Sequence, residues 1–181
     1  MRYCILLMLS LWLLPLHSLS QQIPLHLQIA ISYIGTTEAT GHNDGPEIEH
    51  IIKKMGGAKG ASYCAYFVAF CIDSAKVKTP TVRSGMARGY IRKNSIPAND
   101  VLIGKTQIPA GTIVIFRKGE TPYGHVGFTY RWYKQYGTTV EGNTSLGIKG
   151  SQSNGDGIYA RKRKIEPLNY FRITNFTLVT Y

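Results

Sequence analysis

Two residues of this sequence stand where cysteine chemistry would need them, and the first is a cysteine at the start of an apolar helix. Cys64 lies in the first turn of an almost wholly apolar run over residues 63–75. The unpaired amides at a helix N-terminus favour negative charge, so they lower the pKa of a thiol there. They can also hold the charge that develops on a carbonyl oxygen under attack. Cys64 is therefore our candidate nucleophile for acyl transfer, and core packing is the alternative if it has no partner.

His125 is the candidate general base, because it is the only histidine that opens an expected strand. Gly124 and Gly127 leave room beside its imidazole, while Val126 and Phe128 alternate to the opposite face of that strand. A thiol nucleophile needs such a base to activate it. The alternative for His125 alone is an ordinary half-buried strand histidine.

Glu141 and Asn143 are candidates for the group that orients the imidazole and stabilises its positive form. Both follow a short strand expected over residues 138–140, and a hairpin through 134–137 would place that strand antiparallel to the His125 strand. At alternate positions the two side chains would share one face, with Gly142 on the other. A solvated turn is the alternative, since this composition is also common in turns.

The remaining cysteines, histidines and acidic turns have ordinary explanations. Cys71 lies about 10.5 Å of helix rise beyond Cys64, too far for a disulfide, so we expect two free thiols with Cys71 as a core residue. His26 falls in the lead-in, His50 falls on a helix, and the turn over 42–44 could border a substrate groove. Neither the acidic turns nor the cysteine spacing matches a calcium or zinc site, so we expect no metal and no cofactor.

These residues require a helix packed against a sheet, and the chain has patterns for both. Two helices are expected, over 46–55 with Asp44 as cap and over 63–75 with Ser62 as cap; the piece over 83–92 is also compatible with a helix. Strands are expected over 112–116, 125–133, 138–140, 157–163 and 176–181. Helices followed by antiparallel strands predict an α+β fold, with a helix on a small twisted sheet or half-barrel.

The N-terminus has the pattern of an export signal. Arg2 precedes an apolar run over residues 4–16, which is shorter than the roughly 18 residues of a membrane span, and Ser18-Leu19-Ser20 offers cleavage before Gln21. We therefore expect residues 1–20 to be a signal peptide and residues 21–181 to be one domain, without a stable membrane anchor. The mature chain is expected to be a periplasmic or extracellular monomer.

The net charge is +11, and the densest basic cluster covers residues 161–164. A charge of this size implies an acidic polymer as partner. Because export would place the chain beside the cell wall, anionic wall polymers are the expected partner and nucleic acid is not. A solvated, solubilising basic surface is the alternative.

The motifs in this order resemble the CHAP amidase/peptidase family of papain-like hydrolases, over roughly residues 40–145. The resemblance rests on residues 61–68 around Cys64, on Gly124-His125-Val126-Gly127, on Glu141-Gly142-Asn143 and on the lead-in over 109–116. Thr112 stands where that family often has Asp. The resemblance implies that Cys64 is the nucleophile, His125 the base, Glu141 the orienting acid and Asn143 a further polar member of the site.

Members of that family cleave peptidoglycan, either at the N-acetylmuramoyl-L-alanine amide or within the peptide, so the resemblance implies this substrate and an open cleft. Five aromatic residues could line such a cleft: Tyr63, Tyr66, Tyr123, Trp132 and Tyr136. Two other functions stay open. One is a non-catalytic module that only binds the wall, and the other is a cysteine protease or transglutaminase-like enzyme on the same scaffold.

Overall fold

The computed structural model describes residues 22–146 and 155–181, so the expected leader over residues 1–20 lies outside the described residues. In chain order the elements are α1 (Leu25–Ser32), α2 (Pro46–Lys54), α3 (Cys64–Ser74), the 3₁₀ helix η1 (Ala87–Tyr90), β1 (Ile96–Pro97), α4 (Ala98–Leu102), β2 (Ile113–Lys118), β3 (Gly124–Tyr133), β4 (Tyr136–Thr144), β5 (Gly157–Lys164) and β6 (Phe171–Thr177). Among the described helices, none is long and apolar enough to span a membrane.

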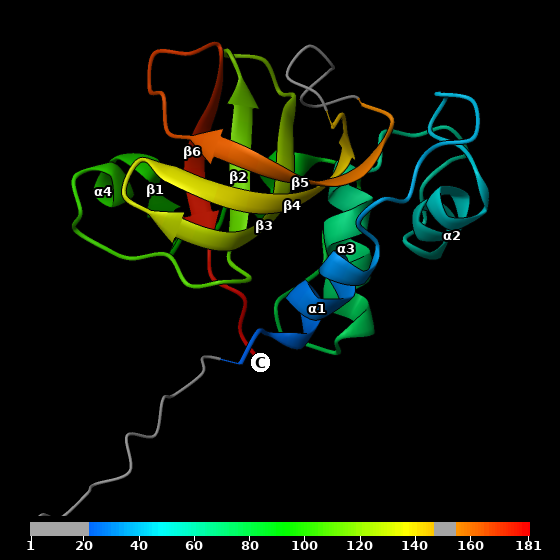
Figure 1. Cartoon of the computed structure of the whole chain (residues 1–181), viewed down its shortest axis with the longest axis horizontal. Helices are drawn as coiled ribbons and strands as arrows, with labels where there is room; N and C mark the ends of the chain where they lie inside the picture. Colours follow the sequence, from blue (N-terminus) through cyan, green and yellow to red (C-terminus); the bar gives the residue numbers. More distant parts are fainter. Residues whose placement is uncertain (1–21, 147–154) are drawn as a thin grey trace, which may run out of the picture.

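The six strands form one antiparallel sheet in the order β1-β6-β2-β3-β4-β5. Register shifts interrupt the β2–β6, β3–β4 and β4–β5 pairs, and such irregularities increase the twist of a sheet. In Figure 1, β4 and β5 consequently run across the direction of β2 and β6, which gives the sheet the shape of a half-barrel. The expected α+β fold, with helices packed on a small antiparallel sheet, is confirmed.

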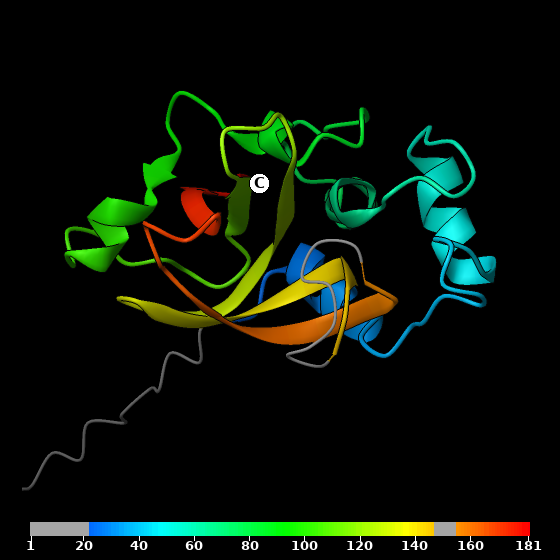
Figure 2. The ribbon, with the colours of Figure 1, turned by 90° about the horizontal axis from the view of Figure 1, so that it is seen from above.

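Helices cover the two faces of this sheet unequally. The face that carries Ile113, Ile115, Val126 and Phe128 packs in one core with α1, α2 and α3. Figures 1 and 2 show α1 and α3 beside the sheet and α2 further out. The opposite face forms a smaller core in which Ala98 and Val101 of α4 take part; its sheet residues are Val114, Phe116, Ile173 and Phe176.

The two expected helices are present, but their caps differ from the prediction. Every side chain of α3 from Cys64 to Ile72 is buried, as the apolar run predicts. Ser62 does not cap it, because the helix begins one residue later and Tyr63 holds the cap position without a side-chain bond. Asp44 does not cap α2 either; its carboxylate accepts hydrogen bonds from Thr40 instead.

Other parts of the chain differ more from the sequence-based expectation. The compatible helix over 83–92 shortens to η1, and the short elements β1 and α4 were not foreseen. The last strand is β6 (Phe171–Thr177), so the prediction of a strand over 176–181 was wrong. Beyond β6 the chain leaves the sheet, and Thr180 exchanges hydrogen bonds with Lys78 and Thr79.

Candidate active site

Cys64 is the first residue of α3, the position the sequence predicted for a nucleophile. The first bond of the helix runs from the Phe67 N–H to the Tyr63 carbonyl at 2.7 Å, so the N–H groups of residues 64–66 have no acceptor within the helix. The Cys64 residue is only 4% exposed. The thiol therefore stands at the positive end of a buried helix, shielded from bulk water.

His125 lies in β3 next to the start of α3, and it is wholly buried. Its Nε2 is 2.9 Å from Oε2 of Glu141. Because an ionised carboxylate only accepts hydrogen bonds, Nε2 carries the proton of the neutral ring and Nδ1 is left as the acceptor. Nδ1 has no hydrogen-bond partner among the described residues. Cys64 is the thiol close enough to the ring to influence its pKa.

The surroundings of His125 favour its charged form. Burial by itself lowers the pKa of the imidazole, but the nearby Cys64 sulfur and the hydrogen-bonded Glu141 carboxylate, together with their negative charges, outweigh burial and raise the pKa to about 9. The ordinary value is 6.5, so the difference corresponds to about 3 kcal/mol in favour of the imidazolium. At neutral pH the ring is therefore mostly in its charged form.

Glu141 supplies the carboxylate behind this imidazole, on β4. Burial raises the pKa of its carboxyl, but the charge and hydrogen bonds of Arg163, with those of His125, hold it well below the ordinary value of 4.5. The Thr139 hydroxyl also donates to Oε1, at 2.5 Å. Gly127 makes the approach possible, because a Cβ there would lie 2.5 Å from Cγ of Glu141.

Asn143 lies at the start of α3 rather than against His125. The amide orientation that satisfies its neighbours places its oxygen 3.3 Å from the Tyr63 N–H and its nitrogen within reach of Asn43 Oδ1 and the Gly155 carbonyl. Its φ of 56° is left-handed, a conformation that asparagine tolerates, and the β4–β5 register shifts at this point. Strict alternation, which would have placed Asn143 beside Glu141, therefore ends before it.

Arg163 of β5 belongs to this site and was missed as an individual residue. Its Nε donates to Oε1 of Glu141 at 2.8 Å, and its Nη2 donates to Oε2. From the sequence it was only one member of the basic cluster over 161–164. The burial pattern of β5 carries the missing signal, since residues 161 and 163 turn inward while 162 and 164 are more exposed.

The other sequence candidates lie in several environments. Cys71 is a buried thiol in the core, where burial raises its pKa well above the ordinary value. Cys64 and Cys71, the cysteines of the described residues, are both free, as expected. Tyr63 and Tyr66 are buried, whereas Tyr123 and Tyr136 are exposed and Trp132 is half-buried. Asn43 donates to the Gly60 carbonyl close to the start of α3. Within residues 22–146 and 155–181, no cluster of three metal-ligating side chains occurs.

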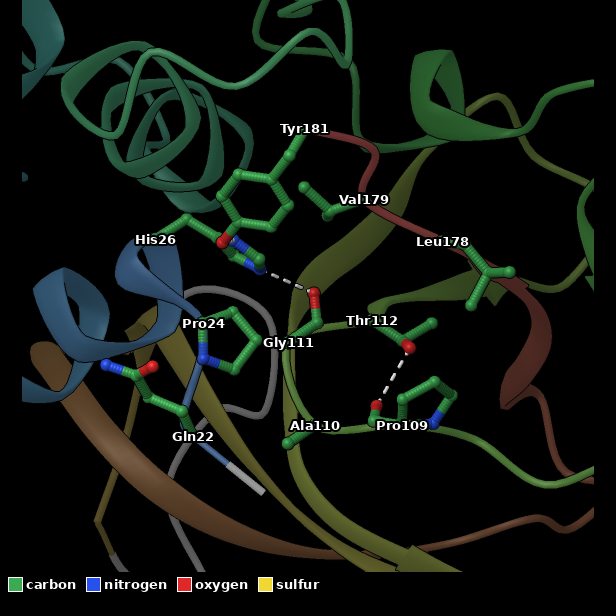
Figure 3. Close-up of a pocket in the computed structure, with 10 residues that line it drawn as sticks. All are labelled: Gln22, Pro24, His26, Pro109, Ala110, Gly111, Thr112, Leu178, Val179 and Tyr181. Carbon is green, nitrogen blue, oxygen red and sulfur yellow. Dashed lines mark hydrogen bonds between the residues drawn. The ribbon is translucent and has the colours of Figure 1, made fainter. Parts of the chain in front are cut away.

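His26, which the sequence placed in the lead-in, lies buried in α1. Figure 3 shows it beside a pocket of about 180 Å³ that is lined by Gln22, Pro24, His26, Pro109, Ala110, Gly111, Thr112, Leu178, Val179 and Tyr181. Both of its ring nitrogens have partners, the Gly111 carbonyl and the Tyr181 hydroxyl, each at 2.8 Å. No cysteine of the described residues lines this pocket; there His26 links α1 to the turn at Gly111 and to Tyr181. Cys64 and His125 remain the candidate site.

A thiol at a helix start, an imidazole on the adjoining strand and a carboxylate behind it define the papain-like class of cysteine–histidine sites. Residues 54–143 match the model of the CHAP domain family, so the chain carries a CHAP domain. Such domains are typically cysteine, histidine-dependent amidohydrolases or peptidases that act on peptidoglycan. No match was found among curated proteins or among solved structures.

Proposed function

We propose that the protein is an exported cysteine hydrolase that cuts peptidoglycan, either at the N-acetylmuramoyl-L-alanine amide or at a peptide bond of the stem or bridge. The observation that carries this proposal is the position of His125, between the Cys64 thiol on one side and the Glu141 carboxylate on the other. The N-terminal pattern supports export, with residues 21–181 as the mature single domain. The net charge, +11 for the full sequence and therefore +10 without Arg2 of the leader, supports retention on anionic wall polymers.

The reaction begins as an acyl transfer to sulfur. The Cys64 thiolate attacks the carbonyl carbon, and the new C–S bond pushes an electron pair onto the oxygen, which the N–H groups at the start of α3 hold. The Nδ1–H of the His125 imidazolium then protonates the leaving nitrogen while the C–N bond breaks. An amine and a thioester on Cys64 result.

Water completes the reaction. The neutral imidazole accepts a proton from water as its oxygen attacks the thioester carbonyl, and collapse of the intermediate breaks the C–S bond. A carboxylic acid leaves, while the thiolate and the imidazolium are restored. Glu141 keeps Nδ1 directed at sulfur throughout, and Asn143 acts by fixing the Tyr63 amide at the start of the helix.

Digestion of purified peptidoglycan by the mature chain tests this function, with Cys64→Ala and Cys71→Ala as matched variants. Both variants remove a buried thiol from the same helix, but only the first removes the nucleophile. We expect Cys71→Ala to release soluble fragments at close to the wild-type rate and Cys64→Ala to release none above background. Mass spectrometry of the new termini then identifies the bond that is cut.

Three results would contradict the proposal. Equal digestion by wild type and Cys64→Ala would exclude Cys64 as the nucleophile. Salt-sensitive binding to the wall without fragments from any variant would instead favour a non-catalytic wall-binding module. A protease or transglutaminase-like activity would appear as cleaved or crosslinked protein with intact wall.

A further inference from the structure

We propose that Arg163 is a positioning residue for the Cys64–His125 pair, acting through Glu141. This inference rests on the proposed function. Arg163 does not touch the reacting atoms; it holds the carboxylate that holds the imidazole. The evidence is a continuous set of contacts that runs from β5 through β4 and β3 to the start of α3.

The first step is the geometry of the carboxylate. Arg163 donates through Nε to Oε1 at 2.8 Å and through Nη2 to Oε2, which is the two-pronged contact that a guanidinium makes with a carboxylate. Oε1 also accepts from Thr139, and Oε2 also faces Nε2 of His125 at 2.9 Å. Each oxygen therefore has two partners, so the carboxylate cannot rotate without breaking several hydrogen bonds.

The second step is the support of the guanidinium itself. The side chain of Arg163 is only 9% exposed, and its guanidinium carbon lies 5.1 Å from the ring centre of Phe116 and 5.9 Å from that of Phe171. These two rings are stacked on one another, and both contact the His125 ring. The same aromatic wall thus fixes Arg163 and the imidazole relative to each other.

The third step is electrostatic. Glu141 is wholly buried, and an unpaired carboxylate there would take up a proton. Arg163 is the main cation that opposes this, with Arg161 of the same strand and His125 of β3 as the other charged groups that act on Glu141. His125 in turn faces Cys64 of α3. Loss of Arg163 should therefore raise the pKa of Glu141, lower that of His125 and reduce the thiolate–imidazolium population.

The experiment compares Arg163→Met and Arg163→Lys with Arg172→Met as control. Arg172 lies on β6 and pairs with Glu120, outside the site. Three readouts are used: the rate of Cys64 alkylation by iodoacetamide at pH 7, located by mass spectrometry; the ¹⁵N NMR titration and tautomer of His125; and kcat and KM for wall digestion. The first two require no substrate.

We expect Arg163→Met to slow alkylation by about tenfold or more, to lower the titration midpoint of His125, and to reduce kcat with little change in KM. Arg163→Lys keeps a charge but loses the planar fork, so its values should lie between those of Arg163→Met and wild type. Arg172→Met should match wild type. If Arg163→Met does not fold, Arg163→Lys decides the question by the same NMR titration.

An unchanged His125 titration and tautomer in Arg163→Lys and in any folded Arg163→Met would overturn the inference, even if stability or activity fell. The result is separable from the proposed function. If wild type leaves peptidoglycan intact but the Arg163 variants shift the His125 titration, the positioning role stands and the substrate is wrong. If wild type digests the wall and the titration does not move, the function stands and the positioning role fails.

Discussion

Replacement of Glu141 by Gln should disable the site while keeping its shape. With the carboxylate, the pKa of His125 is about 9, so about 1% of the rings are neutral at pH 7. Without it, only the nearby Cys64 thiol opposes the lowering effect of burial, so the pKa of His125 should fall. The population of the reactive thiolate–imidazolium pair should fall with it.

The amide has a second effect, on the orientation of the ring. A glutamine nitrogen can donate to Nε2, which would move the remaining proton to Nδ1 and leave no acceptor for the Cys64 proton. A wrong tautomer of this kind lowers kcat by about 10⁴ in a serine protease triad. For Glu141→Gln we therefore expect kcat for wall digestion to fall by about 10² to 10⁴, with KM little changed.

The same substitution should also destabilise the fold, because the buried guanidinium of Arg163 loses its carboxylate. Removal of one partner of a buried ion pair costs about 3–5 kcal/mol. Glu120→Gln is the matched control: its carboxylate pairs with Arg172, but its side chain is 78% exposed, so a change of about 0–1 kcal/mol is expected.

Urea unfolding and the pH dependence of kcat/KM, measured on both variants, check these values. The reasoning would be refuted if Glu141→Gln kept the wild-type pH profile and lost no more stability than Glu120→Gln. Loss of stability with an unchanged pH profile would show that Glu141 serves the fold and not the imidazole.

Two further predictions concern the same contacts. Gly127→Ala places a Cβ 2.5 Å from Cγ of Glu141 and 2.7 Å from the Val140 carbonyl oxygen. We therefore expect urea unfolding to show about 1–3 kcal/mol of destabilisation, with a loss of wall digestion. Wild-type stability and activity would show that β3 and β4 can move apart without cost and would contradict this prediction. The second prediction is a pH dependence of the free energy of unfolding, measured in urea. The Glu141 contribution to it is present above about pH 4.5 and is lost as pH falls through the lowered folded pKa, whereas the His125 contribution is complete below pH 6.5 and is lost as pH rises through about 9, so the pair should contribute most between about pH 5 and 6.5. An equal difference in stability between wild type and a His125→Ala variant at pH 6 and at pH 10 would contradict this.

Periodicity predicted the elements whose burial is one-sided or complete. The apolar spacing of α2, the unbroken apolar runs of α3 and β2, and the alternation of Val126 and Phe128 in β3 each express which sides of the element leave water. The short elements β1, α4 and η1 have too few residues to show a period. The end of the chain was predicted as a strand because its residues suit one, but β2 already pairs with β6 over residues 113–118, so the last residues bond to Thr79 instead.

For the site, the sequence by itself determined the chemical types and the local setting of three groups: a thiol at a helix start, an imidazole between glycines on a strand, and a carboxylate on the next strand. These are local properties, or follow from one hairpin. Tertiary structure decided the rest. Three features depend on how a curved sheet brings β5, β4, β3 and α3 together. They are the approach of Cys64 to His125, the departure of Asn143 from strand alternation, and the selection of Arg163 from a run of four basic residues. Charge alone does not distinguish Arg163 from its neighbours; burial against Phe116 and pairing with Glu141 do.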